Sequence, residues 1–333
     1  MAANGLGNVA PNPLVGAVIV HNDKVIGEGY HQLYGEAHAE VNAIQSVADK
    51  SILPQSTIYV NLEPCAHYGK TPPCADLIIE HGFKRVVIAN EDPFPEVLGK
   101  GIERIKKAGI TVTNGVLKEE GEFLNRRFFT FHSKKRPYII LKWAQTNDGF
   151  IDHVRSDGSD SSALKITNKT SNRLVHKWRA TESAILIGKR TALLDNPRLT
   201  NRSGNGKNPM RIVIDLNGEL PQQLNLFSDG NKTVVATRMV DSNTKSRDII
   251  PISNHDRAPE EILDALYARN IQSLIIEGGS NTLNRFIDMG LWDEARVFTS
   301  TESISKGIAA PLLNRQAEER VEIDTDILEY FRN

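Results

Sequence analysis

One histidine, two cysteines and one glutamate of this chain stand at spacings that suit a catalytic zinc site. His38 and Glu40 are two positions apart, and Cys65 and Cys74 follow with eight residues between them. Zinc held by one histidine and two cysteines keeps a fourth position for water and lowers the pKa of that water toward neutrality. In zinc deaminases, a glutamate two residues after the histidine transfers protons without binding the metal. The pattern therefore predicts a hydrolytic deaminase with His38, Cys65 and Cys74 on zinc and Glu40 as the proton shuttle.

The segment between the two cysteines is longer than in the usual deaminase signature, which has two residues there. Gly69, Pro72 and Pro73 fit a turn that brings Cys74 back at the start of a helix. The N-terminus of a helix favours the thiolate form that zinc requires. The longer segment is therefore compatible with one shared metal.

Two other interpretations of these residues stay open at this point. The two cysteines and the histidine could lie apart in the core, because free cysteine is commonly buried, although both cysteines of the chain fall inside this one pattern. A closed structural zinc site with His67 as its fourth ligand is the stronger rival. It would leave Glu40 without a chemical role, although glutamate is common on exposed helix faces.

The composition favours a two-domain enzyme that acts on a small molecule. A chain of 333 residues can form two domains, each with its own core. The 40 Lys and Arg nearly balance the 41 Asp and Glu, which argues against a nucleic-acid or anionic-membrane surface. The sequence has no apolar run of membrane-spanning length and no signal-peptide pattern at its start. With both cysteines assigned to the metal, the cytoplasm is the expected location.

The order of apolar runs indicates an α/β architecture. In the first half, a hairpin is expected at 15–20 and 25–30, strands at 57–62 and 85–90, and helices at 37–47 and 74–81. The basic, proline-ended segment 131–137 is expected to be a linker between domains. In the second half, strands are expected at 138–144, 184–188, 211–215, 233–237 and 273–276, helices at 260–270 and from 281, and a polar loop at 204–208.

A pair of glycines follows the last of these expected strands, in Glu277-Gly278-Gly279. Where a strand ends in Gly-Gly and a helix begins, backbone N–H groups can bind a phosphate at the positive end of the helix dipole. The same pair also forms ordinary tight turns. The dinucleotide fingerprint G-x-G-x-x-G and the P-loop are both absent from the sequence, so a dinucleotide would need another architecture.

Motifs along essentially the whole chain follow the order found in one known family. In the first half they are Pro11-Asn12-Pro13-Leu14-Val15-Gly16, Gly35-Glu36-Ala37-His38-Ala39-Glu40, and Leu62-Glu63-Pro64-Cys65 through Pro72-Pro73-Cys74. In the second half they are Lys142, Asp148-Gly149, Arg179, Ala184-Ile185-Leu186-Ile187-Gly188, Asp195-Asn196-Pro197, Leu199-Thr200, Arg202 and Glu277-Gly278-Gly279. The chain thus resembles the bifunctional riboflavin-biosynthesis deaminase/reductase family.

This resemblance implies an α/β fold with a cytidine-deaminase-like domain over 1–134 and a dihydrofolate-reductase-like domain over 135–333. The first domain would use one zinc ion per chain to deaminate a diaminopyrimidinone that carries a phosphoribosylamino group. The second would use NADPH to reduce the ribosyl group to ribityl. The partner is then a small phosphoribosylated pyrimidine rather than nucleic acid or a membrane, and a homo-oligomer formed through the reductase domain is compatible with the family.

The resemblance also implies roles for individual residues. In the deaminase domain, Asn12, His31, Lys70 and Asp92 would bind the substrate; lysine can pair with a phosphate, and asparagine can both donate to and accept from a pyrimidine edge. In the reductase domain, Lys142 would lie at the reacting sugar carbon and assist protonation. The substrate would contact Arg179, Leu199, Arg202 and Glu277, and the cofactor would contact Ala144, Thr191, Asp195 and the segment from Gly279.

Two departures from the family pattern bear on these implications. The chain begins inside the family's first helix, so the deaminase domain is expected to lack part of its outer layer. Lys165 replaces the tryptophan of a Trp-Ile-Thr motif, after a long segment at 153–163 rich in Ser and Asp, which alters a cofactor contact. A deaminase with an impaired reductase domain, a nucleic-acid base deaminase, and a regulatory module with structural zinc remain as alternatives.

Overall fold

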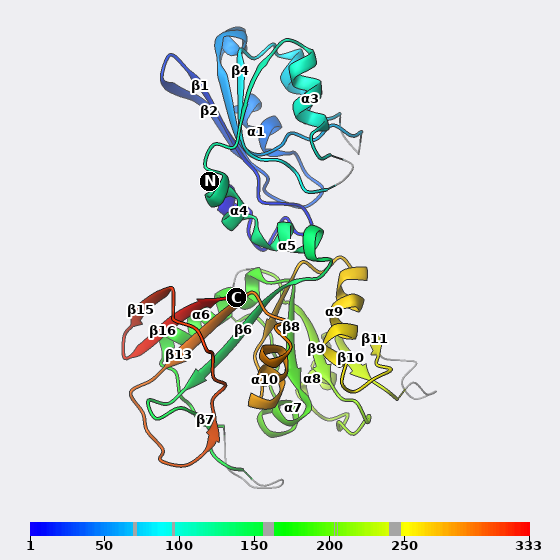
Figure 1. Cartoon of the computed structure of the whole chain (residues 1–333), viewed down its shortest axis with the longest axis vertical. Coiled ribbons are helices and arrows are strands. Elements are labelled where there is room, and N and C mark those ends of the chain that lie inside the picture. Colours follow the sequence, from blue (N-terminus) through cyan, green and yellow to red (C-terminus); the bar gives the residue numbers. More distant parts are fainter. Residues whose placement is uncertain (69–71, 95–96, 156–162, 203, 205, 240–247) are drawn as a thin grey trace. The chain divides into compact units, whose positions relative to one another are not determined.

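The computed structural model of the chain describes residues 1–68, 72–94, 97–155, 163–202, 204, 206–239 and 248–333. The chain forms two compact units, Met1–Lys135 and Arg136–Asn333, and each has its own sheet (Figure 1). Among the described residues, no helix is long and apolar enough to cross a membrane.

The sheet of the first unit begins with the expected hairpin. Strands β1 (Gly16–His21) and β2 (Lys24–Tyr30) pair antiparallel. Asn22 and Asp23 connect them with positive φ angles of 47° and 59°. Two consecutive left-handed residues form the hairpin turn whose twist matches that of the flanking strands, so the hairpin prediction is confirmed.

Three parallel strands complete this sheet, in the order β2-β1-β3-β4-β5. Strands β3 (Thr57–Leu62) and β4 (Arg85–Asn90) have the predicted bounds, and β5 (Thr111–Asn114) is an addition. Helix α1 (Ala39–Ser46) begins two residues later than predicted, and α2 (Cys74–Glu80) begins where predicted. The remaining helical elements are η1 (Ala2–Gly5), η2 (Lys50–Gln55), α3 (Lys100–Lys107), α4 (Lys118–Leu124) and α5 (Arg126–Lys134).

The expectation of a linker over 131–137 is wrong for its first half. Residues Phe131 to Lys134 are the last turn of α5, and Lys135 ends the helix in a left-handed conformation. Phe128 and Phe131 are both buried, and residues three apart lie on the same helix face. Burial of this apolar face accounts for the helix where the basic residues suggested an exposed segment.

The second unit has a nine-stranded sheet in the order β11-β10-β9-β8-β12-β6-β13-β16-β15. The first seven strands in this spatial order, from β11 across to β13, are parallel to one another. Strands β16 and β15 are added antiparallel at the edge next to β13. The strands are β6 (Tyr138–Gln145), β8 (Ala184–Gly188), β9 (Met210–Ile214), β10 (Thr233–Thr237), β11 (Asp248–Pro251), β12 (Ser273–Ile276), β13 (Glu294–Thr299), β15 (Glu319–Ile323) and β16 (Asp326–Arg332). A separate pair joins β7 (Phe150–Asp152) to β14 (Ile308–Ala309).

Helices cover both faces of this sheet, so its central strands are apolar on both sides. In β6, Ile139 and Leu141 belong to the core beneath α9 (Ala258–Ala268) and α10 (Ser280–Asp288). Tyr138 and Ile140 point to the opposite core, which contains residues of α6 (Lys169–Thr181), α7 (Lys189–Asp195) and α8 (Asn225–Ser228). Lys142 continues this second series and therefore lies on the α6 face.

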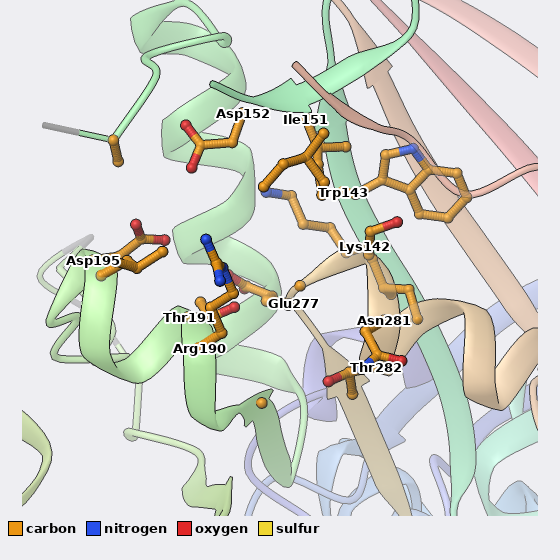
Figure 2. Close-up of a pocket in the computed structure, with 18 of the residues that line it drawn as sticks. Lys142, Trp143, Ile151, Asp152, Arg190, Thr191, Asp195, Glu277, Asn281 and Thr282 are labelled. Atoms are coloured by element: carbon orange, nitrogen blue, oxygen red, sulfur yellow. The ribbon is translucent and has the colours of Figure 1, made fainter. Parts of the chain in front are cut away.

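The carboxyl ends of the parallel strands surround a pocket (Figure 2). Strand β12 ends at Ile276, Glu277 to Gly279 turn the chain, and α10 begins at Ser280, close to the predicted Asn281. Gly279 has a φ of 59° and precedes the helix. Glycine adopts this conformation without the steric cost that a side chain would bring. The predicted strand–Gly-Gly–helix unit is therefore present.

Candidate active sites

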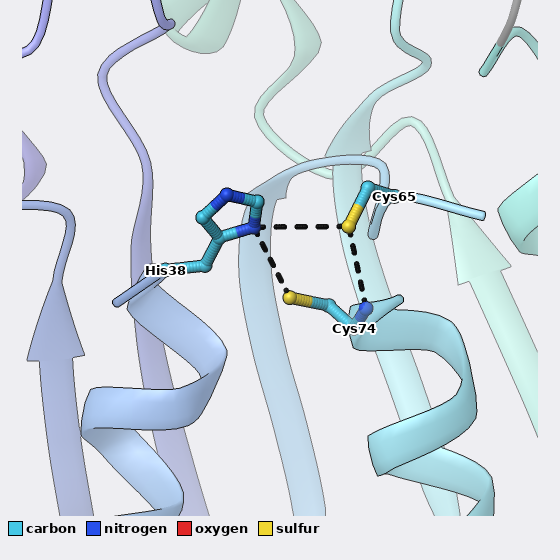
Figure 3. A group of neighbouring side chains, drawn as sticks. All are labelled: His38, Cys65 and Cys74. Atoms are coloured by element: carbon cyan, nitrogen blue, oxygen red, sulfur yellow. Dashed lines mark hydrogen bonds between the residues drawn. The ribbon is translucent and has the colours of Figure 1, made fainter. Parts of the chain in front are cut away.

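The three predicted zinc donors lie together at one end of the first unit's sheet. His38 Nδ1 is 3.3 Å from Cys74 Sγ and 3.7 Å from Cys65 Sγ (Figure 3). Zinc–nitrogen and zinc–sulfur bonds in tetrahedral geometry would separate such atoms by about 3.6 Å. All three donor atoms lie within 4.8 Å of one another. The donor set and its spacing therefore fit one zinc ion with room for a fourth ligand.

Three elements bring these donors together. His38 is the N-cap of α1, Cys65 follows the end of β3, and Cys74 is the first residue of α2. The backbone N–H of Cys74 donates to Cys65 Sγ at 3.3 Å. Cys74, together with His38, lowers the pKa of the Cys65 thiol to about 4. The same contact with Cys65, together with burial, raises the pKa of the Cys74 thiol. Without a metal, the site therefore favours one thiolate, on Cys65.

Glu40 lies in the first turn of α1 and is only 3% exposed. Its carboxylate interacts with the Cys74 thiol, and burial raises its pKa. A buried carboxylate beside the metal donors can exchange a proton with a group bound there. His67 is exposed and lies outside the donor cluster, whereas the two cysteines lie close together in space. The geometry thus fits neither of the two alternative interpretations of the cysteines.

Asn12 and His31 form a pair beside the metal donors. Asn12 Nδ2 lies 3.1 Å from His31 Nε2, and His31 Nδ1 lies 3.0 Å from the Ala37 carbonyl oxygen. If Nδ1 carries the proton, Nε2 accepts from the Asn12 amide, which leaves Asn12 Oδ1 for a ligand. The His31 and His38 rings contact edge to face at 5.5 Å between centroids. The structure thus brings two predicted substrate residues to the zinc donors.

Two further asparagines, which the sequence analysis did not identify, hold the segment that carries Asn12. Asn125 accepts from the Leu14 backbone N–H at 2.8 Å and donates to the Leu14 carbonyl at 2.9 Å. Asn61 also donates to the Leu14 carbonyl and accepts from the backbone N–H of Gly16. Neither asparagine gave a signal in the sequence, because its partners are far away in the chain.

Asp92 follows β4 and is 7% exposed. Its Oδ1 accepts from the Phe94 backbone N–H at 2.8 Å, and burial raises the pKa of Asp92 to about 6. Lys70, the fourth predicted substrate residue of this domain, lies outside the described residues.

The pocket of the second unit has a volume of about 1270 Å³. Lys142 and Glu277 line it, and Figure 2 shows both around the same space. Arg179 pairs with Glu277 through Nε–Oε1 at 2.9 Å and Nη2–Oε2 at 2.6 Å. Burial lowers the pKa of Lys142, whereas Glu277 raises it. The Glu277 side chain is 7% exposed, and although this burial raises its pKa, the pair with Arg179 outweighs it and keeps the pKa below the usual value.

All four predicted cofactor residues line this pocket: Ala144, Thr191, Asp195 and Gly279. A Cβ atom added at Gly279 would lie 3.2 Å from Thr191 Oγ1, so the glycine keeps this wall open. Asp195 Oδ1 pairs with Arg155 Nη2 at 2.5 Å, and Arg155 also pairs with Asp152. The sequence did not predict this network, which lies at the start of the segment that departs from the family.

Of the four predicted substrate residues of the reductase domain, only Glu277 lines the pocket; Arg179, Leu199 and Arg202 do not. Leu199 is buried at 3% exposure with a φ of 53°. Arg202 is exposed, and its Nε donates to His176 Nε2 at 3.2 Å. Arg179 Nη1 lies 3.5 Å from the Thr200 carbonyl oxygen, which connects this segment to the Arg179–Glu277 pair.

The pocket also contains residues that the sequence analysis did not identify. Lys165 lines it and is exposed, where the family has tryptophan. Asn217, His255 and Arg285 come from three separate loops or helices. They have no common sequence motif, so only the folded chain shows them together.

Comparison with known proteins assigns both halves of the chain. Residues 2–90 match the family model for the cytidine and deoxycytidylate deaminase zinc-binding region. Residues 137–301 match the RibD C-terminal domain. The riboflavin biosynthesis protein RibD of Aquifex aeolicus is 37% identical over 329 residues, which cover 97% of this chain and 90% of that protein. RibD of Bacillus amyloliquefaciens is 36% identical and covers 94% and 85%, respectively.

Solved structures of similar proteins match nearly the whole of this chain. A Thermotoga maritima structure described as a diaminohydroxyphosphoribosylaminopyrimidine deaminase/5-amino-6-(5-phosphoribosylamino)uracil reductase has 38% identity and a TM-score of 0.89, with coverage of 99% and 95%. RibD of Acinetobacter baumannii has 31% identity and a TM-score of 0.88, with the same coverage. The resemblance and the two-domain fold expected from the sequence are thereby confirmed, and the chain belongs to the RibD family of riboflavin biosynthesis proteins.

Proposed function

We propose that His38, Cys65, Cys74 and Glu40 perform the deamination and that the pocket around Lys142 performs the reduction. The chain is a bifunctional enzyme of riboflavin biosynthesis with deaminase and reductase activities. The observation that carries the residue assignment is the cluster of three zinc donors beside the buried Glu40. The comparisons give no support to a deaminase-only or nucleic-acid-editing chain.

In the deaminase step, a ring amino group of the phosphoribosylaminopyrimidine is replaced by oxygen from water, and ammonia leaves. Zinc, when bound, lowers the pKa of a water ligand and supplies the nucleophile. Glu40 accepts the proton that this water loses and returns it to the departing amino group. Asn12 Oδ1 and Asp92 orient the pyrimidine through hydrogen bonds, since both lie at the end of the sheet where the donors meet.

In the reductase step, the ribosyl group opens and becomes ribityl, which adds two hydrogens. NADPH, when bound, supplies one of them as hydride. Lys142 Nζ supplies the other as a proton to the ring oxygen that the opening releases. Ala144, Thr191, Asp195 and Gly279 form the cofactor side of the pocket, while the Arg179–Glu277 pair forms the substrate side with Leu199 and Arg202.

The test is the product mass after incubation with the diaminopyrimidinone ribosyl phosphate, with and without NADPH. We expect loss of one amino group in both reactions and a gain of two hydrogens only with NADPH. Glu40→Gln should retain zinc, lose deamination by about a hundredfold or more, and still reduce the deaminated intermediate. A Glu40→Gln variant that deaminates normally would refute the role of Glu40, and wild type that deaminates without reducing would implicate Lys165.

We also propose that the partner is this small phosphoribosylated pyrimidine alone and that the chain forms a homo-oligomer through its reductase domain. The nearly balanced charge supports the absence of nucleic acid. Light scattering of the full chain and of its reductase half tests the oligomer, since equal subunit numbers are expected for both.

A further inference from the structure

A second buried glutamate lies next to the zinc donors and has no part in the mechanism above. Glu63 precedes Pro64 and Cys65 and is only 4% exposed. Its Oε2 accepts from the backbone N–H groups of Asp92 at 3.2 Å and Gly99 at 3.0 Å. Its Oε1 accepts from those of Gly101 at 2.9 Å and Ile102 at 3.1 Å. One carboxylate thus satisfies four backbone donors.

These donors belong to two parts of the site that are far from Glu63 in sequence. Asp92 is the proposed substrate carboxylate after β4, and the other three donors surround the start of α3. Unpaired N–H groups at the start of a helix, together with the helix dipole, favour a carboxylate there. The turn of α3 also packs tightly on the cysteine segment, because a Cβ atom at Gly101 would lie 2.0 Å from the Pro64 carbonyl oxygen.

We propose that Glu63 is a positioning residue that fixes the backbone of Asp92 relative to the zinc ligand Cys65. This inference rests on the substrate role proposed above for Asp92. The chain from Glu63 to Cys65 spans two peptide bonds, and the hydrogen bond from Asp92 reaches the same carboxylate. The Asp92 side chain is in turn held by the Phe94 N–H. Glu63 therefore couples the place where the metal is held to the place where the substrate is held.

The test is a double-mutant cycle with Glu63→Gln and Asp92→Asn, measured as KM and kcat of deamination. The amide that Glu63→Gln introduces would accept from only one pair of donors and would face the other pair with its own N–H groups. We expect Glu63→Gln and Asp92→Asn each to raise KM about tenfold with a smaller change in kcat. Because both act through Asp92, the double variant should resemble Asp92→Asn alone.

Two controls separate positioning from general loss of stability. Ser56 is 1% exposed in the same unit, and its hydroxyl donates to the Ile52 carbonyl. Ser56→Ala removes this buried hydrogen bond away from the site and should leave the deaminase KM unchanged. Reduction of the deaminated intermediate, measured on the same Glu63→Gln protein, should also be unchanged, and zinc content should stay near one per chain.

Each result decides the question. Multiplicative effects in the double variant would show that Glu63 acts independently of Asp92 and would overturn the inference. An unchanged KM in Asp92→Asn would refute the substrate role of Asp92 and the inference with it. A raised KM in Asp92→Asn together with an unchanged KM in Glu63→Gln would refute only the positioning role of Glu63. If Glu63→Gln loses zinc, Glu63→Asp, which keeps the charge, is measured at saturating zinc. Metal loss in both variants would show that Glu63 supports metal binding rather than the placement of Asp92, and would overturn the inference.

Discussion

Arg179 forms a two-point ion pair with Glu277, which lines the reductase pocket, with donor–acceptor distances of 2.9 and 2.6 Å. Both side chains lie on the α6 face of the sheet with Lys142. A bidentate guanidinium–carboxylate pair has a fixed orientation. The negative charge of Glu277 therefore stays near Lys142, where it supports the protonated amine that burial disfavours.

The first prediction concerns the alkaline side of the reductase pH profile. In the proposed reduction Lys142 must be protonated to donate, and burial keeps its pKa below the usual lysine value. Glu277→Gln removes the neighbouring anion and leaves Arg179 unpaired, so the pKa of Lys142 falls further. The alkaline limb of kcat/KM should move to lower pH, with a loss of about tenfold above the wild-type midpoint.

The matched control for this change is Glu322→Gln, at an exposed position on β15. Its pH profile should follow that of the wild type. An alkaline limb that stays in place in Glu277→Gln would show that Lys142 is not the group that titrates.

A second prediction follows from the contact between His176 and Arg202. His176 Nε2 accepts from Arg202 Nε. The pKa of His176 is lowered by burial and, to a smaller extent, by the positive charges of Arg179 and Arg202. Glu277 and the Thr200 backbone raise this pKa but do not cancel the effect. Since the folded pKa lies below that of a free histidine, near 6.5, the contact is present at neutral pH and is lost when His176 gains a proton in acid.

The reductase KM for the phosphorylated substrate should therefore rise several-fold as the pH falls below about 6.5. His176→Gln keeps an acceptor for Arg202 but cannot take up this proton, so its KM should vary less with pH. Steady-state kinetics from about pH 5 to 8, the range in which histidine titrates, check this. The same acid rise in both proteins would count against His176.

The sequence predicts the buried strands of this fold better than its surface elements. Strands β3, β4, β8, β10 and β12 have the predicted bounds. The last four are buried along nearly their whole length, as expected for strands covered on both faces, whereas β3 alternates between buried and more exposed residues. Strand β5 is short and polar, and β13 to β16 were not predicted. Strand β13 pairs with the distant β6 and β16, whereas β15 and β16 form a local hairpin closed at Ile323 and Asp326.

Some misses had a usable local signal. Helix α6 was not predicted, although Asn168 caps it by accepting from the Ser171 N–H at 2.9 Å, and Val175 and Trp178 follow at helical spacing. Helix α9 starts two residues earlier than predicted, where Pro259 stands in its first turn.

The functional sites also contain some residues that the sequence predicts and others that it does not. The zinc donors and Glu40 lie in compact motifs whose chemistry identifies them. The four donors to Glu63 are backbone groups, and the Arg155–Asp195 pair joins two distant segments. Neither arrangement leaves a pattern in the residue types, so both required the folded chain.

Metal removal gives a third prediction. All three zinc donors belong to the first unit, whereas the pocket residues belong to the second. A chelator should reduce deamination at least about a hundredfold and leave reduction of the deaminated intermediate intact. Added zinc should restore deamination. Metal content and both rates are measured on the same sample, and full deamination by metal-free protein would contradict the zinc assignment.

The last prediction is that Gly101→Ala destabilises the deaminase domain, although alanine normally stabilises a helix by about 1 kcal/mol relative to glycine. Gly101 lies in the first turn of α3, and an added Cβ would lie 2.0 Å from the Pro64 carbonyl oxygen. That oxygen is backbone next to Cys65 and cannot move without displacing this proposed zinc ligand. The steric cost should exceed the gain in helix propensity, with a net loss of about 2 kcal/mol or more in the free energy of unfolding.

Because two units need not unfold together, residual deamination and reduction are measured after heating at a series of temperatures. Deamination should be lost at a lower temperature in Gly101→Ala, with reduction unaffected, whereas Lys107→Ala on the exposed end of α3 should behave as the wild type. Equal heat resistance in Gly101→Ala and the wild type would show that α3 can shift away from the cysteine segment, which would also weaken the case for Glu63 as a rigid connection.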